Sequence, residues 1–430
     1  MQTKFLWFLI YFVTTEGFGL RSESWGGLGK ASLGWFGAMQ MLVAILSVAA
    51  IVPGMKYLFR NRKTPIGSAV LMISLLPPYI ILMTIARGAF GADVGFGELF
   101  RNLLQLKFFL LIYLFAYLIS RKYGFENALQ AMAIYALVSA VSILLIIAFD
   151  LKTAVAVSKT SLTDATRLFR MTFPGALLVA MGWLLYFSRF VSRGGIVNGI
   201  ASIVCLAATI SQLHRSTLAS IAITILFLAY WVLTSAKATT TKRRWVLGGV
   251  FGILVIGAIL YFSFSSGLAV DYVKSSLMEV TDSSGNYNVR TNLLINSWNY
   301  VIFDTFGLGL GLDWDQYEDL ATLLEKSFTA GPTFDSSFAN VLIVFGLPGV
   351  GLYIWLLLQL AGLTRSRNMA RDEPLVWAFA LFLRTFLVYC VFIGFGYDFV
   401  VISSGTATFL FVIVAAVRLQ EIRSSTGYPA

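Results

Sequence analysis

The chain alternates between long apolar runs and short polar connections. Runs of about 20 apolar residues, the length that a helix needs to cross a lipid bilayer, recur from one end to the other. They lack the residue-by-residue alternation of a membrane β-barrel strand, so each is predicted to be a helix. We therefore predict an all-α polytopic membrane protein with about 12 transmembrane helices, at residues 5–20, 34–53, 66–86, 103–120, 128–149, 174–191, 196–211, 217–234, 246–264, 338–361, 375–395 and 400–417.

The positions of the basic residues set the expected orientation. If the N-terminus is cytoplasmic, the short connections and tails on that side carry 18 Lys and Arg, and the short ones on the other side carry 5. Short loops rich in Lys and Arg stay in the cytoplasm, so we predict an N-in, C-in topology, with the other side facing the periplasm or its equivalent. The net charge of +11 comes largely from these loops, and it does not indicate a nucleic-acid partner.

Composition supports a membrane protein and limits the chemistry. Hydrophobic residues make up 58% of the chain and charged residues 12%, against roughly 25% charged in soluble proteins. Cys205 and Cys390 both lie inside apolar runs, so we expect buried hydrophobic side chains and no disulfide or thiolate metal site. The run 5–20 has no small-residue cleavage site, which favours a retained span over a signal peptide.

Two connections on the predicted periplasmic side are long. The segment 265–337 joins the ninth and tenth predicted helices, and a smaller one covers residues 150–173. Long connections between packed elements commonly carry function. We expect residues 1–430 to form a single transmembrane domain that bears these two periplasmic loops.

Three polar motifs fall on that same side. "SQLHRSTLAS" places His214, the chain's one histidine, and Arg215 in a tight turn between two spans. "RTNLLINSWNYVIFDTFGLGLG" begins at Arg290, continues as a predicted surface helix and ends in a glycine stretch. "DSSFANVLIVFGLPG" begins with Asp335 and Ser336 immediately before a span.

In this order and on this side, the motifs resemble those of the bacterial O-antigen polymerase and O-antigen ligase superfamily (Wzy and WaaL), over about residues 196–361. The resemblance implies a GT-C-type glycosyltransferase that uses undecaprenyl-diphosphate-linked oligosaccharides as donor and acceptor. It also implies that Arg215 and Arg290 bind the donor diphosphate. Asp335 stands where ligases typically carry His, which favours a repeat-unit polymerase. A flippase and a chain-length regulator are further partners that it implies, besides membrane lipid.

The residues themselves suit this chemistry. Guanidinium groups bind phosphate oxygens through two parallel hydrogen bonds, and they stabilise the charge that develops on a leaving diphosphate. The Asp335 carboxylate could take the proton of the acceptor hydroxyl, giving inversion, or attack the anomeric carbon, giving retention; both stay open. Because arginines supply positive charge, we expect neither a metal nor another cofactor. Asp313 and Asp315 are the alternative, as an acidic metal-binding pair.

Each candidate also has a structural interpretation. His214 and Arg215 could form a polar hairpin tip, Arg290 could contact lipid phosphate, and Asp335 with Ser336 could cap a helix.

Three further arginines are secondary candidates. Arg384 lies in the middle of a span, where it is expected to face the bundle interior and meet a lipid phosphate or an acid such as Glu16. Arg167 and Arg170, in the 150–173 loop, could contact glycan or headgroups.

Two alternative functions remain. An O-antigen ligase, which transfers lipid-linked glycan to lipid A core, shares the arginine chemistry. A transporter or flippase of lipid-linked sugars belongs to another class, and it would concentrate charged and helix-breaking residues at the membrane midplane. Here the polar residues concentrate in the outer loops, which favours an enzyme.

Overall fold

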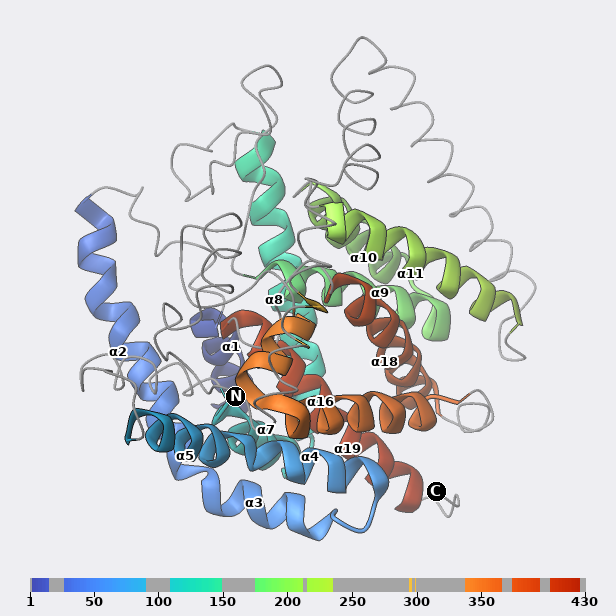
Figure 1. The fold of residues 1–430 in the computed structure, drawn as a ribbon. Helices are drawn as coiled ribbons and strands as arrows, with labels where there is room; N and C mark the ends of the chain where they lie inside the picture. Colours follow the sequence, from blue (N-terminus) through green and yellow to red (C-terminus); the bar gives the residue numbers. More distant parts are fainter. Residues whose placement is uncertain are drawn as a thin grey trace.

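The computed structural model describes residues 2–14, 27–89, 109–148, 175–211, 215–234, 294–295, 298, 337–365, 373–394 and 403–425. Every regular element in these ranges is an α-helix (Figure 1). Among the described residues, five helices are long and apolar enough to cross a membrane, or six if one bent pair is a single span. The all-α fold with several candidate membrane spans is therefore confirmed, whereas the number twelve stays a prediction.

Eleven of the predicted spans overlap described helices; the predicted span 246–264 lies outside the described residues. The helices are α1 (Gln2–Thr14), α2 (Gly27–Ala49), α3 (Ile51–Arg60), α4 (Pro65–Ser74), α5 (Leu76–Ala89), α7 (Leu111–Ser120), α8 (Gly124–Ala148), α9 (Ala176–Arg193), α10 (Ile196–Ile210), α11 (Arg215–Thr234), α16 (Ser337–Leu363), α18 (Pro374–Ile393) and α19 (Ser403–Ser425). Cys205 and Cys390 are buried free thiols, as predicted.

Two predicted spans are interrupted, and a proline explains each break. A proline ring clashes with the carbonyl four residues earlier and removes one backbone donor. Helix α2 ends at Ala49, four residues before Pro53, and α3 continues at an angle of 49°. Helix α4 ends at Ser74, four residues before Pro78. The predicted span 34–53 therefore bends at its end, whereas the predicted span 66–86 is confirmed as one candidate membrane span, Pro65–Met83, with a short break at Leu75.

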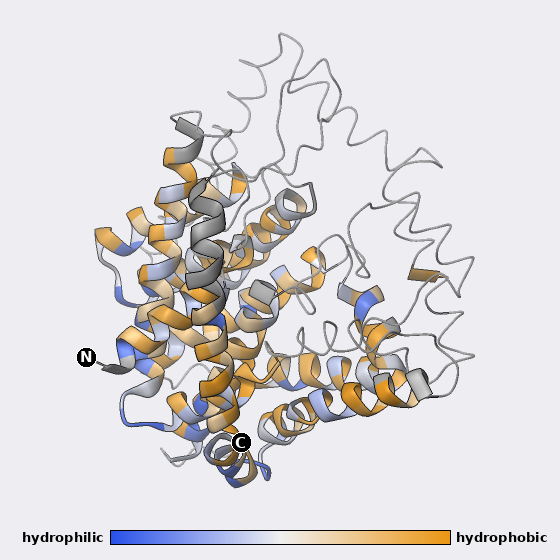
Figure 2. Cartoon of the chain, turned by 90° about the vertical axis from the view of Figure 1, so that its left-hand side faces the viewer, coloured by the Kyte–Doolittle hydropathy of each residue, from blue (hydrophilic) through white to orange (hydrophobic). Residues whose placement is uncertain are grey.

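Aromatic side chains fill the contact between α1, α7 and α19. Trp7 is fully buried, and its ring stacks on Phe115 with centroids 5.4 Å apart. The edge of Phe411 meets the same ring at 5.6 Å. Hydrophobic residues predominate along the helices, and hydrophilic ones occur at several turns, including those near the C-terminus (Figure 2). Helices from both ends of the sequence therefore share one packed core.

Connections that we predicted to be cytoplasmic meet at one end of the bundle, called the basic end below. Arg60, at the end of α3, forms an ion pair with Glu421, near the end of α19. Ser120, at the end of α7, lines the same pocket as Arg60. Arg423 donates a hydrogen bond of 2.5 Å to the carbonyl of Leu363, at the end of α16. These four helix ends share one face, as an alternating topology requires.

The C-terminal end of α16 is held by two arginines from other helices. The carbonyls of a helix's last turn lack partners within the helix and carry partial negative charge. Arg423 of α19 donates to the carbonyl of Leu363, and Arg384 of α18 donates to that of Thr364 at 3.4 Å. Both guanidinium groups therefore stabilise this end of α16.

Candidate functional site

The structure describes two of the predicted site residues at least in part. Arg384 is described completely, and Arg215 is the first residue of α11, with its backbone described but not its side chain. The other candidates lie outside the described residues: Arg167, Arg170, His214, Arg290, Asp335 and Ser336. Their roles stay predictions, and the described helices that precede or follow them show where their segments attach.

Helix α11 runs antiparallel to α18. Trp231, late in α11, lies against Trp377, early in α18, with ring centroids 6.0 Å apart. Further along α18, Arg384 lies over Phe227, one turn earlier in α11, at 5.6 Å. Residue numbers therefore increase along α18 as they decrease along α11. If the two helices stay side by side in this way, Arg215, the first residue of α11, lies beside the C-terminal end of α18.

Helix α16 begins at the same end of α18. The Ser337 N–H donates a hydrogen bond of 3.0 Å to the carbonyl of Gly394, just after α18 ends. Ser337 is fully buried and follows Asp335 and Ser336 directly in sequence. The helices that begin at Arg215 and next to Asp335 therefore start at one end of the bundle, called the far end below, opposite the basic end.

Buried polar side chains collect at the far end. In α11 they recur at Thr217, Ser220 and Thr224, a spacing that places them on one helical face. In α16 they are Ser337 and Asn340, and Asn340 is 1% exposed. The ends of neighbouring helices add Thr14, Thr209, Thr406 and Thr408. Sequence reasoning did not select these residues, although a polar residue every three or four positions in an apolar run is a readable signal.

One hydroxyl of this group has no partner. The Thr224 Oγ1 is buried and makes no hydrogen bond within the part of the chain that the structure describes. A buried polar atom without a partner is costly. Thr224 lies nine residues, or about 13 Å, along α11 from Arg215, so the polar face of α11 runs from the far end to the middle of the helix.

Helix α16 is kinked within the glycine-rich motif. We predicted one unbroken helix over 338–361 with the glycines at its other end, but Gly346 interrupts it with φ 66° and ψ −164°, a conformation open essentially to glycine alone. Pro348 follows two residues later. The Tyr79 hydroxyl of α5 donates to the carbonyl of Phe345 at 3.4 Å, which gives that group a partner beside the break. The kink separates a short segment, 337–345, that carries the polar start of α16.

Arg384 lies away from the far end. It is about ten residues before the end of α18, or roughly 15 Å along the helix axis. Its guanidinium is half-buried between the rings of Phe227 and Trp231, and it donates to the carbonyl of Thr364. These contacts agree with the expected interior position, and they give Arg384 a stabilising partner. Its predicted alternative partner, Glu16, lies outside the described residues.

The described residues give no direct test of a metal site. Within the described ranges, no group of three or more His, Cys, Asp or Glu is arranged to hold a metal ion. Asp313 and Asp315, the acids of the alternative metal hypothesis, lie outside those ranges. Metal independence therefore stays a prediction.

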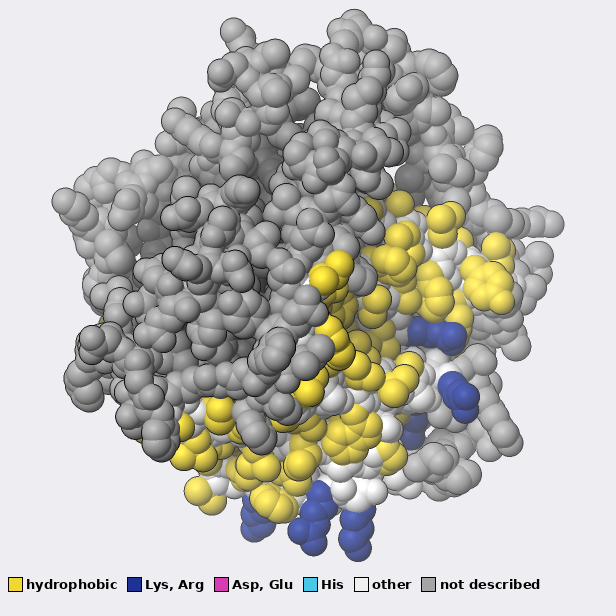
Figure 3. Space-filling model, viewed as in Figure 1, with side chains coloured by type: hydrophobic (Ala, Val, Ile, Leu, Met, Phe, Trp, Pro, Cys, Tyr) yellow, Lys and Arg dark blue, Asp and Glu magenta, His cyan; other side chains and the backbone are white. Residues whose placement is uncertain are grey.

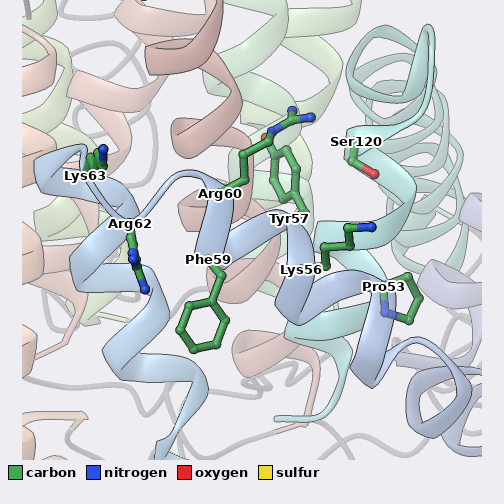
Figure 4. Close-up of a pocket in the computed structure, with 8 residues that line it drawn as sticks. All are labelled: Pro53, Lys56, Tyr57, Phe59, Arg60, Arg62, Lys63 and Ser120. Carbon is green, nitrogen blue, oxygen red and sulfur yellow. The ribbon is translucent and has the colours of Figure 1, made fainter.

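A second polar site lies at the basic end. A pocket of about 540 Å³ is lined by residues of α3, the turn after it and the end of α7: Pro53, Lys56, Tyr57, Phe59, Arg60, Arg62, Lys63 and Ser120 (Figure 4). On the face drawn in Figure 3, Lys and Arg side chains gather along the lower edge, below hydrophobic ones. In the sequence these cations indicated only topology, although Lys56, Arg60 and Lys63 recur at helical spacing.

Comparison with known proteins adds no further constraint. No protein-family model matches the chain, and no curated protein matches it. Its function is therefore inferred from its own motifs and from the arrangement of the helices that bear them.

Proposed function

We propose that the protein is a membrane glycosyltransferase that polymerises undecaprenyl-diphosphate-linked oligosaccharide repeat units at the periplasmic face of the bacterial inner membrane. The product is O-antigen, capsule or exopolysaccharide. The observation that carries the proposal is that α11 and α16 begin at the same end of α18. The first helix starts with Arg215 and the second follows Asp335 in sequence, so the helices next to two distant motifs start at the same end of the bundle.

In the proposed reaction, the bond between the anomeric carbon of the donor glycan and its diphosphate oxygen breaks. The lipid diphosphate leaves with the electron pair, and an acceptor sugar hydroxyl becomes bonded to the anomeric carbon. Arg215 and Arg290 bind the leaving diphosphate, where charge develops. Asp335 takes the proton of the acceptor hydroxyl, or first attacks the anomeric carbon itself. The buried hydroxyl and amide groups of α11 and α16 supply a polar lining for glycan at this depth.

Polymerisation is tested with the purified full chain and lipid-linked repeat units, by gel analysis of product length. We expect a ladder of products with the natural sequence. Arg215→Lys keeps the charge and loses the two-pronged contact, so the rate should fall by roughly 10²–10³. Arg290→Ala and Asp335→Asn should also lose activity severely, whereas His214→Ala should be milder.

The control is Arg193→Lys, the same exchange at an exposed position at the end of α9, and it should leave the ladder intact. Ladder formation by Arg215→Ala at the natural rate would contradict the diphosphate role. Transfer of glycan to lipid A core without a ladder would identify a ligase instead. Movement of lipid-linked sugar across the bilayer without any new glycosidic bond would identify a transporter.

A further inference from the structure

The pocket at the basic end combines four cations with one neutralising acid. Arg60 forms an ion pair with Glu421, which also accepts a hydrogen bond of 2.6 Å from Arg418. Lys56, Arg62 and Lys63 form no ion pair with any acid in the part of the chain that the structure describes. Three of the cations that line the pocket therefore have no counter-charge among the described residues, and such a concentration of positive charge attracts an anion.

The geometry of the pocket suits a phosphate group. Lys56 lies near Ser120 at the gap between α3 and α7, while Arg62 and Lys63 come from the turn that follows α3 (Figure 4). Ammonium and guanidinium groups both bind phosphate oxygens, and the Ser120 hydroxyl can add a further hydrogen bond. The volume of about 540 Å³ leaves room for a phosphate together with the polar group esterified to it.

An apolar stripe leads to the pocket from the lipid-facing surface. Met41, Ile45 and Val48 of α2 are 63%, 61% and 54% exposed, and Val52 of α3 is 78% exposed. The spacing of Met41, Ile45 and Val48 places them along one side of α2. Beyond the bend, Val52 and Lys56 are four residues apart and share one side of α3. An acyl chain lying on this stripe would bring its headgroup to Lys56. A soluble phosphate makes no use of the stripe.

We propose that this pocket is a binding site for a phosphate-bearing anionic lipid headgroup, with the acyl chains along the exposed stripe of α2 and α3. Lys56, beside Ser120, holds the phosphate, and the other cations of the lining add positive charge around it. Phe59, 46% exposed and 5.9 Å from the Arg62 guanidinium, contacts the upper part of the chains. The ion pair of Arg60 with Glu421 connects the pocket wall to α19, and Arg418 of α19 holds the same carboxylate. Bound lipid therefore also braces the contact between α3 and α19. This site is separate from the proposed catalytic end.

The test uses the purified full chain in neutral detergent with phosphatidylcholine, and it measures the apparent Kd for fluorescent phosphatidylglycerol. The variant Lys56→Gln/Arg62→Gln/Lys63→Gln removes the three unpaired cations. Each basic residue near an anionic surface contributes about fivefold in affinity, so we expect a loss on the order of 100-fold. The matched control Lys122→Gln/Arg193→Gln/Arg365→Gln removes three exposed cations that do not line the pocket, and it should lose less than about fivefold.

Unfolding temperature and gel filtration of both variants verify that they fold. Equal losses in the two variants would show diffuse surface attraction and overturn the site. The same holds if the natural sequence binds phosphatidylcholine as tightly as phosphatidylglycerol. Glycerol 1-phosphate is the competitor that separates the two sources of phosphate. Displacement of the lipid by equal concentrations of this soluble compound would overturn the lipid assignment, and no displacement supports it.

Discussion

A methyl group added at Gly349 should open the kink of α16, whereas one added at Gly351 should not. A Cβ at position 349 would lie 2.1 Å from the Phe345 Cβ and 3.1 Å from its Cγ. Phe345 cannot easily yield, because it is 1% exposed and the edge of its ring packs against Phe109 at 5.8 Å. At Gly351, in the same helix, a Cβ meets nothing within 4 Å.

The size of the effect follows from these contacts. Forcing an extra methyl into a packed core costs about 1–3 kcal/mol. Replacing glycine with alanine inside a helix stabilises it by about 0.5–1 kcal/mol through the higher helix propensity of alanine. Gly349→Ala should therefore destabilise the protein by roughly 0–2.5 kcal/mol. We expect a value in the upper part of this range, because the clash involves the Cβ of Phe345 rather than the far end of a flexible side chain. Gly351→Ala receives only the propensity gain, so it should be stabilising by about 0.5–1 kcal/mol.

The assay is reversible unfolding in mixed micelles, followed by circular dichroism, for both variants and the natural sequence. Gly362→Ala is a second control, because a Cβ there also meets nothing within 4 Å. Since the kink carries the start of α16, Gly349→Ala should also reduce glycan polymerisation, and the two controls should not. Equal stability of the 349 and 351 variants would refute the account of a tightly closed kink.

Three further predictions concern the basic end, the topology and the metal. Glu421→Gln removes the acid shared by Arg60 and Arg418. Because these ion pairs are partly exposed, the free energy of unfolding, measured by chemical denaturation, should fall by only about 1 kcal/mol. A loss above about 3 kcal/mol would show a more buried network. In whole cells, Arg62→Cys and Arg243→Cys should react only with membrane-permeant maleimides, and Asp282→Cys should also react with impermeant ones. Labelling of position 243 by an impermeant reagent would reverse the topology and remove the proposed active site from the periplasm. Chelation with EDTA should leave polymerisation unchanged, and loss of activity restored by magnesium or manganese would direct attention to Asp313 and Asp315.

The helices could be predicted from the sequence because lipid imposes a length and an apolar composition on each of them. Their breaks were harder to predict. Pro53, Pro78 and Pro348 all stand in the apolar runs, but a membrane helix tolerates proline when neighbouring groups satisfy the freed backbone. Whether the chain bends, breaks or continues therefore depends on neighbours such as Tyr79, whose hydroxyl reaches the carbonyl of Phe345.

Contacts between helices depend on close packing and on interhelical hydrogen bonds, and few of them could be predicted from the sequence. The motifs holding Arg215 and Asp335 could be assigned to one side of the membrane by counting charges, and the structure adds that their helices start at the same end of α18. For Arg384 the interior position was predictable, but its partners were not. Lipid-facing and protein-facing apolar surfaces have similar composition, so hydrophobicity alone does not determine which helix will present Trp231 or the carbonyl of Thr364.

The kink at Gly346 also makes the first part of α16 a lever arm. Residues 337–345 form an arm of nine residues, about 13 Å long at the rise of an α-helix, and the remainder of α16 is fastened at its other end by Arg384 and Arg423. A rotation of about 5° at Gly346 would carry Ser337 through about 1 Å, a displacement that can alter a catalytic rate by about 10²-fold. A small torsional change at this one glycine would thus become an atomic-scale displacement at the start of α16.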